Sequence, residues 1–254
     1  MPSTSRAADV ARDSAKRRDE YTDEWILARR PPKNAVDPSR PYAFLLEQEP
    51  TAHGCIESVA TIFLTNKECP FRCLMCDLWK NTTDEPVAPG MIRRQIEWAL
   101  ARLEPARHIK LYNSGNFFDP QAIPETDYPS IAEVVSQFDT VIVESHPLMV
   151  GRRCFAFNDM VDADVHVAMG LETVHPDVLG KLNKHMTLND FARAVGRLKA
   201  HGMEARAFIL LRPPFLNEPE GVLWAKRSMD YAFDVGVECC AIIPTRGGNG
   251  AMES

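Results

Sequence analysis

Residues 67–79 read KECPFRCLMCDLW, and this stretch decides the fold class and the chemistry of the chain. Its three cysteines, Cys69, Cys73 and Cys76, are separated by three and then two residues. They follow a short β-branched run, residues 59–65, which predicts a strand. A loop at the carboxyl end of a parallel strand is where α/β folds bind ligands. One such loop can wrap three thiolates around a single metal centre with little closure entropy.

From residue 55 onward, short apolar runs alternate with longer stretches of helical period, which predicts a parallel α/β domain. The runs are nearly continuous in apolar residues, as is typical of strands covered on both faces. The predicted strands are residues 59–65, 109–112, 140–144, 165–169, 205–211 and 239–243. Six strands are too few for an eight-stranded barrel, so the pattern leaves two folds open, a partial barrel and an open doubly wound sheet.

The helices between the predicted strands have recognisable ends. Thr187, with Asp190 three residues later, predicts the start of a helix before the fifth strand, and Gly202 predicts its end. Asn217 predicts the start of the next helix. The buried face of that helix is expected to carry Val222, Ala225, Met229 and Phe233.

The two ends of the chain differ from its middle. Residues 1–50 combine a charge-rich helical pattern over about 7–29 with a proline-rich stretch, so we expect an arm that packs on a core domain of residues 51–254. A disordered tail over the first twenty or so residues is the alternative. Residues 244–254 are too short and glycine-rich for a helix after the sixth strand. We therefore expect a barrel that lacks its last helix, either because the chain is truncated or because a partner or a second copy completes the edge.

Composition narrows the class of protein. No apolar run in the 254 residues approaches the ~18 needed for a membrane span, and the N-terminus has no secretory signal, so a cytoplasmic protein is expected. The net charge of −6 gives no support to binding along a nucleic-acid backbone. Seven irregularly spaced cysteines indicate metal binding, catalysis or core packing rather than a disulfide framework.

Three kinds of site compete for the cysteine motif. A structural zinc site has four closed ligands, often in CxxC pairs, and no partner pair follows here. An electron-transfer ferredoxin uses four cysteines per cluster, and the fourth is absent locally. Core cysteines would not alternate with charged residues as these do. A [4Fe–4S] cluster held by three thiolates leaves one iron open for a cofactor or substrate, and it fits best. A non-catalytic iron–sulfur or zinc protein, serving as an electron carrier or interaction module, remains the alternative.

The CxxxCxxC motif after the first strand of a parallel α/β domain resembles the radical S-adenosylmethionine (radical SAM) superfamily. The resemblance implies a partial (β/α)6 TIM-like barrel in which Cys69, Cys73 and Cys76 hold a [4Fe–4S] cluster whose open iron binds S-adenosylmethionine. It implies an external electron donor and a 5′-deoxyadenosyl radical that abstracts a substrate hydrogen atom. Met75 departs from the pattern, because this position is usually aromatic. The resemblance to the superfamily covers roughly residues 55–245. Residues 169–187 resemble the Elp3/MiaB-like branch, and residues 113–119, 170–173 and 211–218 are most similar to the archaeosine-synthase radical subunits and their uncharacterised bacterial relatives.

Polar residues at the following strand ends complete the predicted site. A Ser-Gly-Asn sequence follows the second strand, where an ordinary turn is the alternative interpretation. One glutamate ends the third strand and another follows the fourth, where solvated acids at helix starts are the alternative. The resemblance implies that a lysine farther along pairs with the carboxylate of the cofactor, although a surface lysine competes with this interpretation. No catalytic acid or base is identified, and the substrate is expected to be a modified nucleoside in RNA or a small metabolite. The candidate cofactor-binding residues are Ser114, Gly115, Asn116, Glu144, Glu172 and Lys184.

Overall fold

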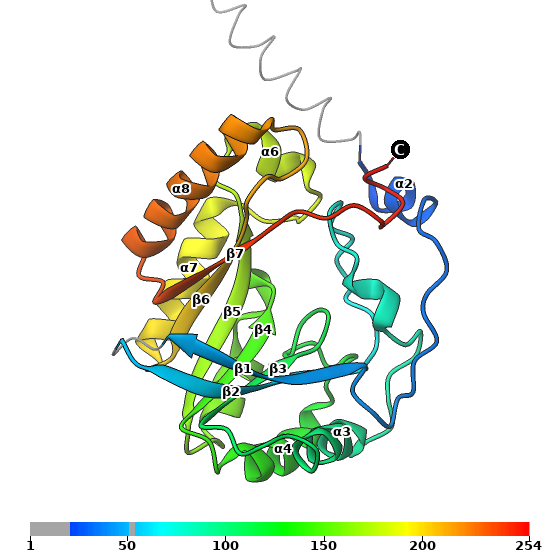
Figure 1. Cartoon of the computed structure of the whole chain (residues 1–254), viewed down its shortest axis with the longest axis vertical. Helices are drawn as coiled ribbons and strands as arrows, with labels where there is room; N and C mark the ends of the chain where they lie inside the picture. The colour runs from blue at the N-terminus through cyan, green and yellow to red at the C-terminus, as the bar shows by residue number, and fades with distance from the viewer. Residues whose placement is uncertain (1–20, 51–53, 254) are drawn as a thin grey trace, which may run out of the picture.

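The computed structural model describes residues 21–50 and 54–253, and its centre is one curled sheet of seven strands (Figure 1). The strands lie in the order β1-β2-β3-β4-β5-β6-β7, so neighbours in the chain are neighbours in the sheet. A doubly wound sheet would reverse its strand order at a switch point, and this sheet does not. The partial barrel is therefore the correct choice between the two predicted folds.

All six predicted strands are confirmed, and they pair in parallel. Their ends differ from the prediction by up to three residues. The strands are β2 (Ile56–Phe63), β3 (His108–Tyr112), β4 (Thr140–Ser145), β5 (Asp164–Glu172), β6 (Glu204–Leu210) and β7 (Cys239–Ile243).

A seventh strand, β1 (Ala43–Pro50), was not predicted. It pairs with β2 in antiparallel register, from Ala43 opposite Phe63 to Pro50 opposite Ile56. Residues 43–50 had been assigned to the N-terminal arm, yet they belong to the same sheet as the core strands. The helix expected over about residues 7–29 begins outside the described residues, and α2 (Asp23–Leu27) is the described part of it. The division of the chain at residue 50 stays a prediction.

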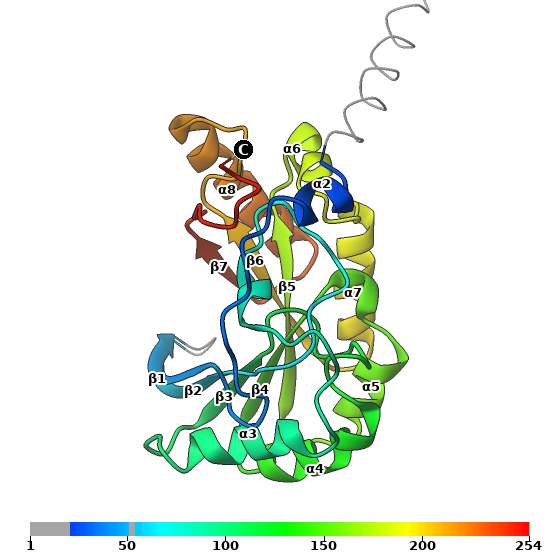
Figure 2. The same ribbon diagram turned by 90° about the vertical axis from the view of Figure 1, so that its right-hand side faces the viewer.

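Helices cover the outer face of the sheet, and its concave face remains open (Figure 1, Figure 2). Alternate strand residues such as Ile62, Leu111, Val143, Val167 and Ala207 point outward into a core with no exposed surface. The remaining α-helices are α3 (Met91–Leu100), α4 (Tyr128–Val135), α5 (Arg152–Asn158), α6 (Pro176–Lys181), α7 (Leu188–Ala200) and α8 (Glu218–Asp234). Within residues 21–50 and 54–253, the 3-10 helices are η2 (Leu78–Asn81), η3 (Glu125–Asp127) and η4 (Pro147–Met149).

The predicted helix starts at Thr187 and Asn217 are confirmed, because both residues form capping boxes. The predicted buried face of α8 was largely wrong. Only Ala225 of the expected residues is fully buried, while the exposed fractions of Val222 and Phe233 are 42% and 52%. Small residues form the true buried face, which lets α8 lie close to the sheet; they are Gly221, Ala225, Ser228 and Ala232.

No helix follows β7 within residues 244–253. In the described part of the chain, no helix has both the length and the apolar character that a bilayer crossing requires.

Candidate iron–sulfur and cofactor site

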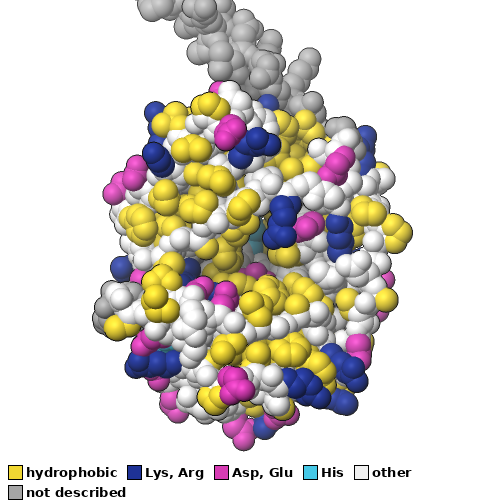
Figure 3. Space-filling view, in the orientation of Figure 1, with side chains coloured by type: hydrophobic (Ala, Val, Ile, Leu, Met, Phe, Trp, Pro, Cys, Tyr) yellow, Lys and Arg dark blue, Asp and Glu magenta, His cyan; other side chains and the backbone are white. Residues whose placement is uncertain are grey.

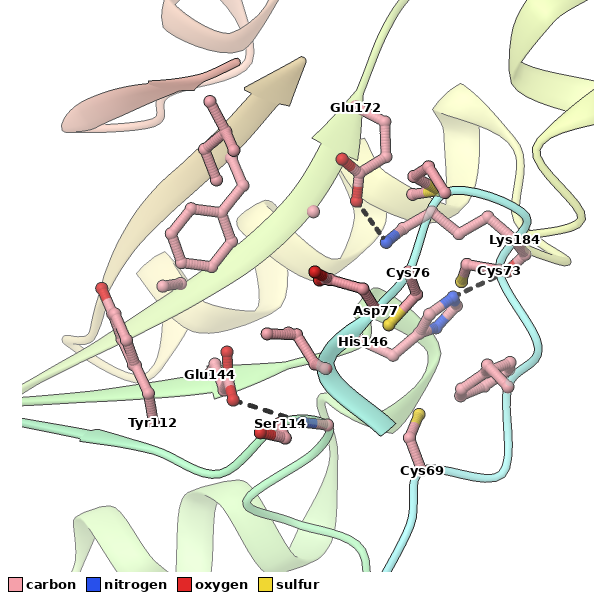
Figure 4. A pocket seen from close by; sticks show the side chains of 18 of the residues that line it. Cys69, Cys73, Cys76, Asp77, Tyr112, Ser114, Glu144, His146, Glu172 and Lys184 are labelled. Carbon is pink, nitrogen blue, oxygen red and sulfur yellow. Dashed lines mark hydrogen bonds and ion pairs between the residues drawn. The ribbon is translucent and has the colours of Figure 1, made fainter. Parts of the chain in front are cut away.

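The cysteine loop lies at the carboxyl ends of the strands, where the sequence predicted a site. Cys69, Cys73 and Cys76 line a cavity of about 350 Å³ together with the ends of β3, β4 and β5 (Figure 4). A hollow opens near the centre of the face seen in Figure 3, with hydrophobic side chains along most of its rim. Burial raises the pKa of the Cys69 and Cys76 thiols to about 12 and that of Cys73 to about 11. Thiols of this kind become stable thiolates when positive charge is bound beside them.

Contacts from three distant segments hold the cysteine loop. The Leu74 N–H donates to the Leu182 carbonyl at 2.9 Å, and Asn249 Nδ2 donates to the Leu74 carbonyl at 2.7 Å. Arg30 forms an ion pair with Glu68 at 2.6 Å, just before the first cysteine. The loop conformation therefore depends on the whole fold as well as on its own sequence.

Glu144, at the end of β4, binds the turn that follows β3. Its Oε1 accepts hydrogen bonds from the backbone N–H groups of Asn113 at 2.6 Å and Gly115 at 3.2 Å. Between them, Ser114 has a φ of 55°, in the left-handed region that non-glycine residues rarely occupy. Burial raises the pKa of the Glu144 carboxyl from 4.5 to about 7, although the bonds from backbone N–H groups act in the opposite direction.

Two residues of this turn contact Cys69 directly. Asn116 Nδ2 donates to Cys69 Sγ at 3.1 Å, and Asn116 Oδ1 accepts from the backbone N–H of His146. A Cβ atom on Gly115 would lie 2.9 Å from Cys69 Cβ, so glycine is needed for this close approach. The predicted Ser-Gly-Asn sequence is thus packed against the first cysteine.

Glu172 and Lys184 form a buried ion pair, with Lys184 Nζ 2.7 Å from Glu172 Oε1 and side-chain exposures of only 8% and 9%. Glu172 follows an irregularity at the end of β5 and has a φ of 65°. A Cβ atom on Gly170 would collide with both charged groups, so this glycine makes room for the pair. Burial lowers the pKa of the Lys184 ammonium, but the charge and hydrogen bond of Glu172, together with the nearby Cys73 and Cys69, outweigh burial, and the net pKa is raised. Lys184 therefore stays protonated inside the protein.

His146 lines the cavity, and its contacts give it a structural role. Its ring stacks on Phe71, with centroids 3.8 Å apart. Nε2 donates to the Lys184 carbonyl at 2.8 Å, because a carbonyl only accepts, and Nδ1 accepts from the Leu148 N–H at 3.2 Å. Burial lowers the pKa of His146 to about 3, so the ring is neutral. Both nitrogens are engaged, which leaves neither free to bind a metal.

The cavity also contains residues that sequence reasoning did not select. Asp77 follows the last motif cysteine, and four aromatic rings lie on the inner side of the sheet. Three of the rings occupy alternate strand positions that face away from the helices. Assigning every second residue of each predicted strand to the inner face would have identified these three from the sequence. The four aromatic residues are Tyr42, Phe63, Tyr112 and Phe208.

Among the described residues, no three His, Cys, Asp or Glu side chains are arranged to hold a single metal ion. A four-iron cluster does not need such convergence, because each of its irons takes its own thiolate. The donor set fits a cluster in a second respect. Thiolates are the ligands that iron–sulfur clusters use, and all three lie on one loop beside a roomy cavity.

Comparison with protein-family models gave no match. Three curated proteins resemble the chain in sequence. An uncharacterised protein of Methanocaldococcus jannaschii is 22% identical over 87% of this chain and 64% of its own length. Archaeosine synthase subunit beta of Methanosarcina acetivorans is 26% identical over 67% of this chain and 53% of its own length. The subunit of the same name from Thermococcus kodakarensis is 28% identical over 62% of this chain and 51% of its own length. The chain thus spans half to two thirds of the length of these relatives.

Solved structures of radical SAM enzymes have a similar fold. The radical SAM methyltransferase TsrM from Kitasatospora setae, solved with tryptophan and a SAM analogue, superimposes with a TM-score of 0.53 at 15% identity, over 72% of this chain and 35% of its own. Methylornithine synthase gives a TM-score of 0.51 at 14% identity, over 74% of this chain and 55% of its own. Coproporphyrinogen III oxidase of Escherichia coli gives 0.51 at 11% identity, over 93% of this chain and 51% of its own.

The curled parallel sheet is the fold of radical SAM enzymes, and its cysteine loop lies in the cavity at the strand ends. Together with the named sequence relatives, this fold supports the predicted placement of the chain in the radical SAM superfamily.

Proposed function

We propose that this chain is a cytoplasmic radical SAM enzyme that cleaves S-adenosylmethionine reductively. The observation that carries the proposal is the composition of one cavity. Three half-buried cysteines from one loop share it with the Glu172–Lys184 ion pair and the Glu144 carboxyl. A non-catalytic electron carrier would have no use for these additional buried charged groups.

Cys69, Cys73 and Cys76 would each hold one iron of a [4Fe–4S] cluster, and S-adenosylmethionine would bind beside it in the remaining space. Bound together, the two groups supply a 5′-deoxyadenosyl radical for hydrogen-atom abstraction. The site agrees with the cofactors of TsrM, whose structures contain a [4Fe–4S] cluster in one case and a SAM analogue in another.

The protein's own side chains would orient the cofactor. Lys184 remains a buried cation, so it suits the carboxylate of the methionine part, while Glu172 holds its ammonium in place. Glu144 fixes the turn at residues 113–116, whose Ser114, Gly115 and Asn116 line the cavity. The contacts with Leu182 and Asn249 and the Arg30–Glu68 ion pair described above hold the cysteine loop in place beside the cofactor space.

The substrate is a modified nucleoside in RNA or a small metabolite, and two relatives named archaeosine synthase subunit beta favour the nucleoside. Both relatives are named as subunits, which supports a partner protein or a second copy at the barrel edge of this chain. The proposed reaction also needs an external electron donor.

The test is anaerobic reconstitution with iron and sulfide, followed by reduction in the presence of S-adenosylmethionine. We expect the brown chromophore of an iron–sulfur cluster and formation of 5′-deoxyadenosine, measured by liquid chromatography. Cys73→Ala removes one of three thiolates and should abolish both signals, because each thiolate holds a different iron.

Cys55→Ala is the matched control, since this exposed cysteine does not line the cavity. It should keep the chromophore and full cofactor cleavage. An intact cluster with normal cleavage in Cys73→Ala would contradict the proposal.

A further inference from the structure

Four aromatic side chains form a continuous row on the inner side of the sheet. Tyr42 precedes β1, and Phe63, Tyr112 and Phe208 lie on β2, β3 and β6. Successive ring centroids are 5.6, 6.0 and 5.8 Å apart. All four rings line the cavity that contains the motif cysteines. We call these four residues the aromatic row.

The aromatic row is not closed in by other side chains. All four residues are only partly buried, although they face the inside of the half-barrel, and none belongs to a buried core cluster. By contrast, Phe117, Tyr128 and Phe157 on the helix side of the sheet contact each other with no exposed surface. Large apolar rings left open inside a cavity gain free energy when a ligand covers them.

Tyr112, in the middle of the row, lies away from the iron–sulfur side of the cavity, whereas Tyr42 at the end of the row accepts a hydrogen bond from the Ser114 hydroxyl at 3.0 Å. In Figure 4, Tyr112 is on the opposite side of Glu144 from all three cysteines. The predicted cofactor residues Glu172 and Lys184 are on the cysteine side of the same view. The cavity therefore has one part lined by thiols and charged groups and another lined by aromatic rings, and Tyr42 joins the two through Ser114.

The geometry of the row favours a flat aromatic ligand over an alkyl chain. Neighbouring rings are inclined by 42°, 65° and 82°, so the row presents both ring faces and ring edges. An aromatic ligand gains from stacking and edge contacts with such rings beyond the area that it buries, whereas an alkyl group gains from area alone. The Tyr112 side chain lines the cavity, and its hydroxyl can offer one polar contact to a heteroatom.

We propose that the aromatic row is the substrate subsite and that it binds a flat aromatic or heteroaromatic group of the substrate. That the bound group belongs to a substrate rests on the proposed radical SAM function. The preference of the row for aromatic ligands is measured by binding alone, without turnover.

The test compares two probes of equal carbon skeleton, 2-naphthol and its fully saturated counterpart 2-decalol. Their dissociation constants are measured by calorimetry with the protein before and after anaerobic reconstitution. The wild-type protein should bind 2-naphthol more tightly than 2-decalol. Phe208→Leu should weaken 2-naphthol binding by about fivefold and 2-decalol binding by less than about twofold. Phe63→Leu is a second variant with the same expected pattern, in case one substitution disturbs folding.

Phe155→Leu is the matched control, because this ring stacks on His201 outside the cavity, and it should change neither constant. Saturating S-adenosylmethionine should leave 2-naphthol binding in place. Displacement of 2-naphthol by bulk tRNA would identify a base carried on RNA, and displacement by free purines alone would identify a small molecule; either result supports the proposal.

Equal loss of both probes in Phe208→Leu and Phe63→Leu would overturn the proposal. Displacement of 2-naphthol by S-adenosylmethionine would also overturn it, since the row would then belong to the cofactor site. Formation of 5′-deoxyadenosine is measured separately, so a failure of the proposed function is distinguished from a failure of the aromatic subsite.

Discussion

Glu144 shows how one buried carboxyl organises the turn that packs against Cys69. It accepts hydrogen bonds from the backbone of residues 113 and 115, and burial raises its pKa from 4.5 to about 7. The folded protein therefore holds a proton on Glu144 at pH values where the unfolded chain has released it. The stability that this proton contributes is complete below pH 4.5 and is lost as the pH rises through about 7.

Glu144→Gln isolates this contribution, because the amide keeps an acceptor oxygen but does not titrate. Between pH 4.5 and 7 we expect the free energy of unfolding to fall less in the variant than in the wild type, by about 2 kcal/mol. His146 and His166 titrate in both proteins, so their opposite trend cancels in the difference. Urea unfolding of the metal-free protein at several pH values measures it.

The control is Glu104→Gln, which changes an exposed glutamate away from the cavity. Its unfolding free energy should follow the wild-type pH dependence throughout. If the unfolding free energy of Glu144→Gln has the same pH dependence as the wild type, Glu144 does not hold a proton in the folded protein over this pH range.

At the scale of single residues, the structure brings together the cysteines that a local pattern selected, and their role as cluster ligands stays a prediction. The three cysteines are close in sequence, so one loop brings them to one cavity. The Glu172–Lys184 pair was not predicted as a pair, although each residue was selected. Its geometry depends on the irregular end of β5 and on the space left by Gly170, and neither is visible as periodicity.

At the scale of elements, β1 ties distant parts of the half-barrel together. Lys110 on β3 is 5% exposed and binds Glu47 and Glu49 of β1. Glu49 also pairs with Arg206 of β6, so it connects two strands that are not neighbours in the sheet. The network therefore links the antiparallel edge strand to the inner side of the barrel.

Lys110→Met should lower the free energy of unfolding by about 1–2 kcal/mol, measured by urea denaturation. Removing the shared cation leaves two carboxylates facing each other, but both are partly exposed and regain some hydration, which limits the loss. Lys226→Met on the exposed side of α8 is the matched control and should change stability little. A Lys110→Met protein as stable as the wild type would mean that the network does not hold β1.

Elements were predictable where apolar residues dominate them. β2 to β7 are apolar runs, whereas β1 contains Glu47, Gln48 and Glu49 and pairs through its backbone at an edge. The glutamates of β1 form ion pairs with Lys110 and Arg206, which lie far along the chain. A local sequence pattern does not contain that information. The prediction of the buried face of α8 was wrong for a different reason. Close packing of this helix on the sheet selects small residues over large apolar ones.

At the scale of the whole molecule, the four cysteines outside the motif decide how many clusters the chain holds. Cys154 is buried in the core, and its thiol contacts the Met203 sulfur at 3.9 Å. Cys239 contacts Arg206 on the inner side, whereas the adjacent Cys240 packs against the core on the outer side. Cys55 is exposed. The side chains of adjacent strand residues point to opposite faces, so Cys239 and Cys240 do not share a metal.

We therefore expect one cluster, with about four irons per chain after anaerobic reconstitution, measured by iron and sulfide analysis. Replacing Cys69, Cys73 and Cys76 together by alanine should remove all bound iron, while replacing Cys239 and Cys240 together should leave the iron content unchanged. About eight irons in the wild type, with an electron paramagnetic resonance signal that survives in the triple variant, would show a second cluster. The iron count also bears on the reaction. With a single cluster on these residues, we propose hydrogen abstraction followed by rearrangement or group transfer, because sulfur insertion would need an auxiliary iron–sulfur centre to donate the sulfur.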